Sequence, residues 1–163
     1  MTAVMEHTAA RTLIDETLFS RLATRITIDH GMDHDMAERI MDQALAFLAA
    51  AATNRCAPIS PSPMVDIGWH TFILYTREYA EFCQRIAGRF IHHVPDDESD
   101  TADRVSAHDE GRSPTLVAIE HAGYAIDPEL WPLTDGSCGP CHEEGNCAAS
   151  GKDGNENTDK RTK

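Results

Sequence analysis

Apolar residues recur at helical spacing in the N-terminal part of the chain, which predicts two consecutive amphipathic helices. The apolar positions are Leu18, Leu22, Ile26, Ile28, Met36, Ile40, Ala44, Phe47 and Leu48. The first helix is expected over residues 15–30, and Gly31 can end it. Asp33 or Asp35 can cap the second helix, which should run to about Thr53.

Proline, serine and glycine mark two further helices after a proline-punctuated connector. Ser62 is a good N-cap and Pro63 a good first residue for a third helix. Gly68 weakens this helix, and Thr76 can restart the chain as a fourth helix. The fourth helix is expected to end at Gly88, which can adopt the left-handed conformation common after helices.

The last apolar positions predict one more helix and a terminal turn. The helix is expected over residues 114–123, because a serine and a proline open it. The turn should pack Leu130 and Trp131 on the core. We therefore predict an all-α fold, a compact helical bundle of about five helices over residues 12–132.

Polar and acidic residues dominate two other segments. Residues 95–113 predict an acidic loop, and residues 133–163 predict a disordered acidic tail, because they contain almost no large apolar side chains. Residues 1–94 hold 11 acidic and 8 basic residues, which leaves −3. Residues 95–163 hold 16 acidic and 6 basic residues, which leaves −10 of the net charge of −13.

This charge distribution limits the partners that we expect. Binding to nucleic acid needs a basic face, which the chain lacks, so we predict no nucleic-acid partner. No segment has the length of a membrane span or the apolar core of a signal peptide, which predicts no membrane partner and a cytoplasmic location. In such a reducing compartment Cys56 and Cys83 should be free thiols.

The third helix carries a candidate metal site. Asp66 and His70 are four residues apart, so both lie on one helix face and can offer a carboxylate oxygen and an imidazole nitrogen to one ion. His92 or His93 could add a second imidazole. Such a set leaves coordination positions open for water or substrate, as in catalytic zinc or non-haem iron sites.

The same residues also fit a purely structural role. Asp66 and His70 can form a local ion pair, and Trp69 can be a core anchor whose indole N–H finds a carbonyl. Tyr79 and Cys83 are four residues apart, so the tyrosine could support a bound ion while the cysteine ligates it. Alternatively, Cys83 is a small buried hydrophobe.

A longer pattern in this region resembles the glycine-rich-domain-containing-protein-like family. The matching residues are Val65-Asp66-x-x-Trp69-His70, Tyr79, Cys83, Gly88 and His92-His93 before Pro95. The resemblance implies a helical module with a largely unassigned role, and it favours His93 over His92. This chain departs from the plant branch of that family, because it has only 10 glycines and no glycine-rich region.

The tail contains a second candidate metal site. Cys-Gly-Pro-Cys-His includes a haem-attachment pattern, but the missing export signal disfavours covalent haem. The Cys-Gly-Pro-Cys sequence also matches the active-site motif of thioredoxin, but the strand and helix that flank that motif are missing here. A compact soft-metal site for zinc or copper(I) would use Cys138, Cys141, His142 and Cys147. The alternative is an unstructured thiol-bearing tail that a modifying enzyme or protein partner could reach.

Two function hypotheses follow. The first is a metal-binding protein that holds zinc, iron or copper through Asp66, His70 and His93, with His92 as the alternative ligand. If that protein is an enzyme, Tyr79 would orient a bound water or substrate, but the sequence indicates no reaction type and no catalytic residue. The second is a non-catalytic interaction module, in which the Trp/His/Tyr cluster is structural and the tail docks a partner, is modified or binds a soft metal.

Overall fold

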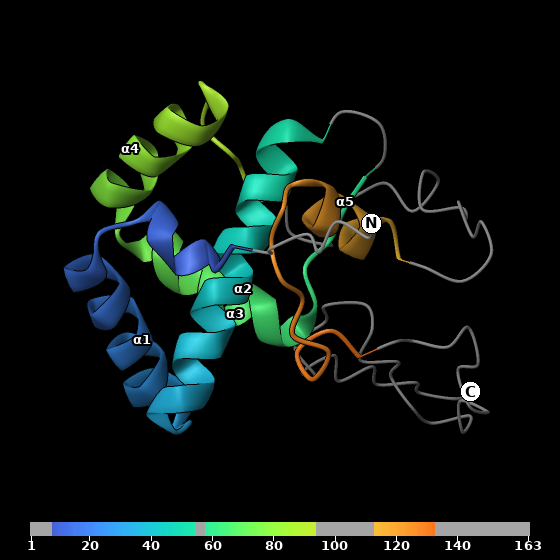
Figure 1. The fold of residues 1–163 in the computed structure, drawn as a ribbon. Coiled ribbons are helices and arrows are strands. Elements are labelled where there is room, and N and C mark those ends of the chain that lie inside the picture. The colour runs from blue at the N-terminus through green and yellow to red at the C-terminus, as the bar shows by residue number, and fades with distance from the viewer. Residues whose placement is uncertain (1–7, 55–57, 94–112, 133–163) are drawn as a thin grey trace, which may run out of the picture. The chain divides into compact units, whose positions relative to one another are not determined.

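A computed structural model describes residues 8–54, 58–93 and 113–132, and within these ranges the chain is all-α (Figure 1). The described residues up to His92 belong with residues 113–132 to one compact unit. The elements in chain order are η1, a 3-10 helix (Ala10–Leu13), α1 (Glu16–His30), α2 (His34–Thr53), α3 (Pro63–Leu74), α4 (Thr76–Ala87) and α5 (Pro114–His121). The predicted fold class and its five α-helices are confirmed.

Capping residues set the bounds of α1 and α2. The Asp15 carboxylate accepts the N–H groups of Thr17 and Leu18 at 2.8 and 3.4 Å, and these bonds lower the pKa of Asp15. Gly31 ends α1 in the left-handed conformation at φ 65°. Asp33, and not Asp35, caps α2. The predicted bounds of both helices are therefore confirmed to within one residue.

Gly68 does not interrupt α3. Helix α3 runs unbroken through Gly68, and the chain leaves the helical conformation only at Tyr75, where φ is −89° and ψ is 62°. A Cβ atom at Gly68 would lie 2.7 Å from the Cβ of Ala44 and 3.1 Å from the carbonyl oxygen of Ile40. The glycine is therefore explained by the close approach of α3 to α2, and the predicted restart at Thr76 is confirmed.

Helix α2 is the centre of the core. It contacts η1 and each of the other four helices, and Figure 1 shows it between α1 and α5. Its buried residues are Ala37, Ile40, Met41, Gln43, Ala44, Leu45, Ala46, Phe47, Leu48, Ala49 and Ala50. Burial on several sides explains why the second half of this helix is apolar almost without interruption.

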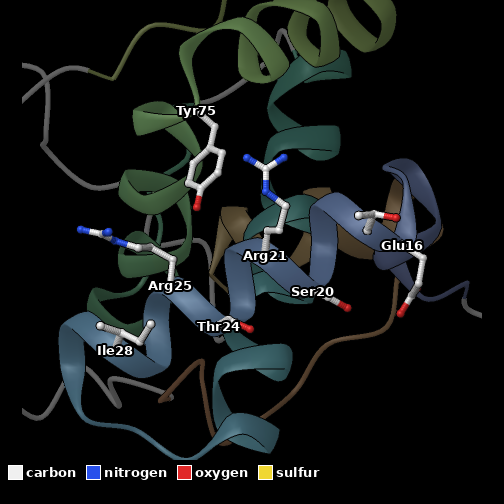
Figure 2. Close-up of a pocket in the computed structure, with 8 residues that line it drawn as sticks. Glu16, Ser20, Arg21, Thr24, Arg25, Ile28 and Tyr75 are labelled. Carbon is white, nitrogen blue, oxygen red and sulfur yellow. The ribbon is translucent and has the colours of Figure 1, made fainter.

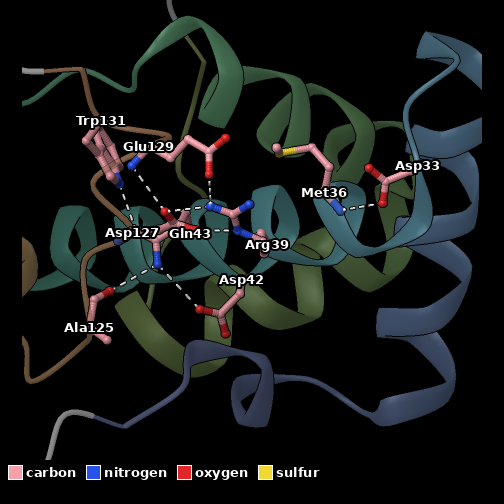
Figure 3. A network of polar contacts seen from close by, with 9 residues as sticks. All are labelled: Asp33, Met36, Arg39, Asp42, Gln43, Ala125, Asp127, Glu129 and Trp131. Carbon is pink, nitrogen blue, oxygen red and sulfur yellow. Dashed lines mark hydrogen bonds and ion pairs between the residues drawn. The ribbon is translucent and has the colours of Figure 1, made fainter.

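A polar network fixes the terminal segment on α2, as Figure 3 shows. Gln43 is only 3% exposed, and its side-chain oxygen accepts the indole N–H of Trp131 at 2.7 Å and the backbone N–H of Asp127 at 3.1 Å. Its amide donates to the Ala125 carbonyl at 3.0 Å. Arg39 donates to the Asp127 carboxylate at 2.7 and 2.9 Å, which lowers the pKa of Asp127. The predicted packing of Leu130 and Trp131 on the core is confirmed, since both are buried.

Residues before the expected module also belong to the packed structure. The N–H of Thr8 donates to the Gly123 carbonyl at 3.0 Å, and Ala10 is fully buried. The Asp42 carboxylate accepts the N–H of Arg11 at 2.7 Å, while burial raises the pKa of this carboxyl. Contacts of the N-terminal segment therefore begin at least four residues before position 12.

Most of the acidic loop and all of the predicted tail lie outside the described residues. None of the described helices is long and apolar enough to cross a membrane.

Candidate metal centre

Packing of one face of α3 leaves Asp66 and His70 near the surface. Val65, Trp69 and Phe72 share the buried face of this helix. Asp66 and His70 directly follow the first two of these residues, so both are rotated away from the core. The Nδ1 atom of His70 lies 3.2 Å from Oδ2 of Asp66. The Asp66 side chain is 28% exposed and the His70 side chain 57% exposed. The predicted pairing of these two side chains on one helix face is confirmed.

The chain returns to this pair after α4. Gly88 ends α4 in the left-handed conformation at φ 65°, and Ile91 is then buried. His93 follows Ile91 by two residues. One ligand atom from each of Asp66, His70 and His93 lies within 4.8 Å of the other two. The structure thus brings together the three residues of the first hypothesis.

His92 lies apart from this group. It is exposed, and its imidazole stacks in a tilted arrangement on the ring of Phe90 with the ring centroids 4.8 Å apart. The group of potential ligands contains His93 and does not contain His92. Of the two adjacent histidines, His93 is therefore the one whose ligand atom lies close to those of Asp66 and His70.

The separations suit a small metal ion after modest side-chain rotation. With zinc–nitrogen bonds of about 2.0–2.1 Å, two ligand atoms in a tetrahedral zinc site lie about 3.4 Å apart. The Asp66–His70 separation of 3.2 Å is already close to this value. His93 has to close by at most about 1.4 Å from the 4.8 Å limit, which side-chain rotation of a half-buried residue can supply.

Trp69 and Tyr79 are buried and hydrogen-bonded to each other. The indole N–H of Trp69 donates to the Tyr79 hydroxyl at 2.8 Å, and that hydroxyl donates to the Ile91 carbonyl at 2.7 Å. Trp69 is a core anchor as predicted, but its partner is a hydroxyl and not a carbonyl. Tyr79 is fully buried, which raises its pKa. Its hydroxyl proton is already donated to the Ile91 carbonyl. It is therefore not placed to orient a water bound on an exposed ion.

Of the cysteines considered as ligands or free thiols, the structure describes Cys83 alone. Cys83 is a free thiol with no exposed surface, and it is not among the potential ligands found in the described residues. Its environment fits the small buried hydrophobe of the structural alternative. Cys56 and the second candidate site, with Cys138, Cys141, His142 and Cys147, lie outside the described residues.

A shallow groove along α1, shown in Figure 2, is a further surface feature that the sequence did not indicate. The guanidinium of Arg21 lies over the ring of Tyr75, 5.1 Å from its centroid, and 3.8 Å from the carboxylate of Glu78. Arg25 pairs with Asp29 at 2.6 Å. Because both arginines already have carboxylate partners, the groove has no excess of positive charge that would attract an anion.

Comparison with known protein families gives a match over most of the described chain. A family model described as UCP032817-like matches residues 8–111, which is more than half of the chain and includes all three candidate ligands. Neither the curated proteins nor the solved structures contain a match to the chain.

The expected resemblance to the glycine-rich-domain-containing-protein-like family is therefore wrong. The pattern behind it includes residues such as Trp69, Tyr79 and Cys83, which are all buried. Side chains of these types are suited to packing between helices, so a short run of them is not specific to one family.

Proposed function

The chain belongs to the UCP032817-like family, which is uncharacterised, and we propose that it binds one divalent transition metal ion through Asp66, His70 and His93. The observation that carries this proposal is the meeting of three ligand atoms, within 4.8 Å of one another, from two segments separated by α4. An ion at this point would connect α3 to the segment after α4.

The donor set favours certain metals. Two imidazole nitrogens and one carboxylate oxygen suit zinc or iron(II), whereas copper(I) prefers the sulfur of cysteine or methionine. The group of ligands contains no sulfur. We therefore propose zinc or iron(II) for this site, and we retain copper(I) only for the cysteines of the tail.

Exposure of the site leaves room for further ligands. Because His70 is 57% exposed, a bound ion would be reached from solvent without opening the helical core. Three protein ligands leave at least one coordination position for water, and a bound zinc ion makes such a water more acidic. Asp66 and His70 would hold the ion from one face of α3, and His93 would hold it from the segment after α4.

The pair of adjacent histidines provides a matched test. Zinc affinity is measured by competition with a chromophoric chelator, on the full chain purified without a histidine tag and with Cys138, Cys141 and Cys147 replaced by serine. We expect one zinc ion per chain. The substitution His93→Ala should weaken binding by more than about 100-fold, because loss of a ligand exceeds the 10- to 100-fold effect of removing an outer hydrogen bond.

The control substitution, His92→Ala, should change the affinity by less than about threefold, because this imidazole is not in the ligand group. Equal losses in the two variants would contradict the proposed ligand set. A folded protein that binds no zinc and no iron(II) would exclude the proposed function and leave the interaction module as the better hypothesis. Zinc that binds only when the tail cysteines are present would place the site in the tail.

A further inference from the structure

One buried hydroxyl connects the two segments that carry the histidines of the proposed site. The Tyr79 hydroxyl accepts from the indole of Trp69, the residue immediately before His70. It donates to the carbonyl of Ile91, two residues before His93. The two bonds are 2.8 and 2.7 Å long, and the tyrosine has no exposed surface. A single side chain thus contacts the near neighbours of both imidazole ligands.

The segment that follows α4 depends on such an anchor. Residues 89–93 lie outside any helix, so the repeating bonds of a helix do not fix their backbone. The Tyr79 bond holds the Ile91 carbonyl, and burial of the Ile91 side chain fixes the same residue. Two residues of chain span at most about 7 Å, so fixing Ile91 restricts the space that His93 can sample.

The hydroxyl is not required for packing of the tyrosine ring. The ring meets those of Phe72 and Phe90 edge to face, each with centroids 5.2 Å apart, and a phenylalanine ring would make both contacts. The oxygen atom adds the bonds to Trp69 and Ile91, and it also interacts with the Cys83 thiol, which contributes to the raised pKa of Tyr79. Its distinctive effect is therefore to hold the segment after α4 against α3.

We infer that Tyr79 is a positioning residue for the metal site: its hydroxyl holds the Ile91 carbonyl and thereby limits how far His93 can move away from the ligand group. This inference rests on the proposed metal-binding function. Hydrogen bonds that orient metal ligands typically change metal affinity by about 10- to 100-fold. Here the bond acts on the backbone that carries the ligand and not on the ligand itself.

A double-mutant cycle separates positioning from a general structural effect. Copper(II) affinity is measured in the full chain with serine at the three tail cysteine positions, for the parent, Tyr79→Phe, His93→Ala and the double variant. Copper(II) is the probe because it binds most tightly among the divalent first-row metals, so two remaining ligands still give a measurable affinity. Circular dichroism confirms that each variant is folded at the temperature used.

We expect Tyr79→Phe to weaken binding about 10- to 100-fold in the parent and less than about twofold when His93 is already alanine. Equal weakening in both backgrounds would overturn the inference, because the hydroxyl would then act on the protein as a whole. An unchanged affinity in Tyr79→Phe would overturn it as well. If the parent binds no metal, the proposed function itself fails, and this outcome is distinct from the other two.

Two further variants test whether the Tyr79 hydroxyl acts through its bond to Ile91. Trp69→Phe breaks the other bond of the same hydroxyl and leaves the bond to Ile91, so it should change the affinity by less than about threefold. A loss in Trp69→Phe as large as in Tyr79→Phe would contradict positioning through Ile91. Tyr75→Phe removes a hydroxyl from the junction between α3 and α4, and it should leave the affinity unchanged.

Discussion

Replacing Gln43 with leucine is expected to lower the free energy of unfolding by about 3–9 kcal/mol. Three groups would lose their partner: the Trp131 indole, the backbone N–H of Asp127 and the carbonyl of Ala125. Each unsatisfied buried polar group costs about 1–3 kcal/mol. Leucine has a similar volume, so the loss would come from the hydrogen bonds and not from a cavity.

Urea denaturation followed by circular dichroism measures this loss. Gln84→Leu is the matched control, because Gln84 is exposed on α4 and the same substitution there should change stability by no more than about 0.5 kcal/mol. Fluorescence should also report partial exposure of Trp131 in Gln43→Leu. A change of less than about 1 kcal/mol would show that Gln43 does not hold the terminal segment on α2.

Replacing Gly68 with alanine is expected to destabilise the fold by about 1–3 kcal/mol. The new Cβ atom would stand 2.7 Å from the Cβ of Ala44, and the carbonyl of Ile40, 3.1 Å away, is backbone that cannot rotate aside. Helices α2 and α3 would have to move apart. This direction is informative, because alanine in place of glycine at an open helix position stabilises by about 1 kcal/mol.

The second substitution Ala44→Gly tests the cause. It removes the atom closest to the new methyl group, so thermal unfolding should show that the double variant recovers part of the stability lost in Gly68→Ala. Additive losses in the double variant would mean that contact with Ala44 is not the source of the strain. A stabilised Gly68→Ala single variant would contradict the close approach of the two helices.

Local signals explain why the helices could be predicted. Asp15, Asp33 and Ser62 cap helices through N–H groups two or three residues away, and Gly31 and Gly88 end them within the last turn. Such information is contained in a short stretch of sequence. The reasons for Gly68 and Gln43 are not local, because their partners come from another helix or from residues 82 to 88 positions away.

The candidate metal site also has one part that local sequence predicts and one part that it does not. The spacing of Asp66 and His70 was sufficient to predict their meeting, since four residues make about one helical turn. The preference for His93 over His92 came from a family resemblance that is itself wrong, so the sequence held no sound reason for it. In the structure His93 belongs to the group of potential ligands, while His92 packs on Phe90.

The most direct test of the proposed site observes the histidine rings during a zinc titration. Long-range nitrogen–proton correlation spectra of the ¹⁵N-labelled full chain, with serine at the three tail cysteine positions, report each imidazole separately. Up to one equivalent of zinc, the ring signals of His70 and His93 should change together, while those of His92 and His121 stay in place. Unchanged signals of His70 and His93, or a change of His92 in place of His93, would contradict a metal site formed by Asp66, His70 and His93.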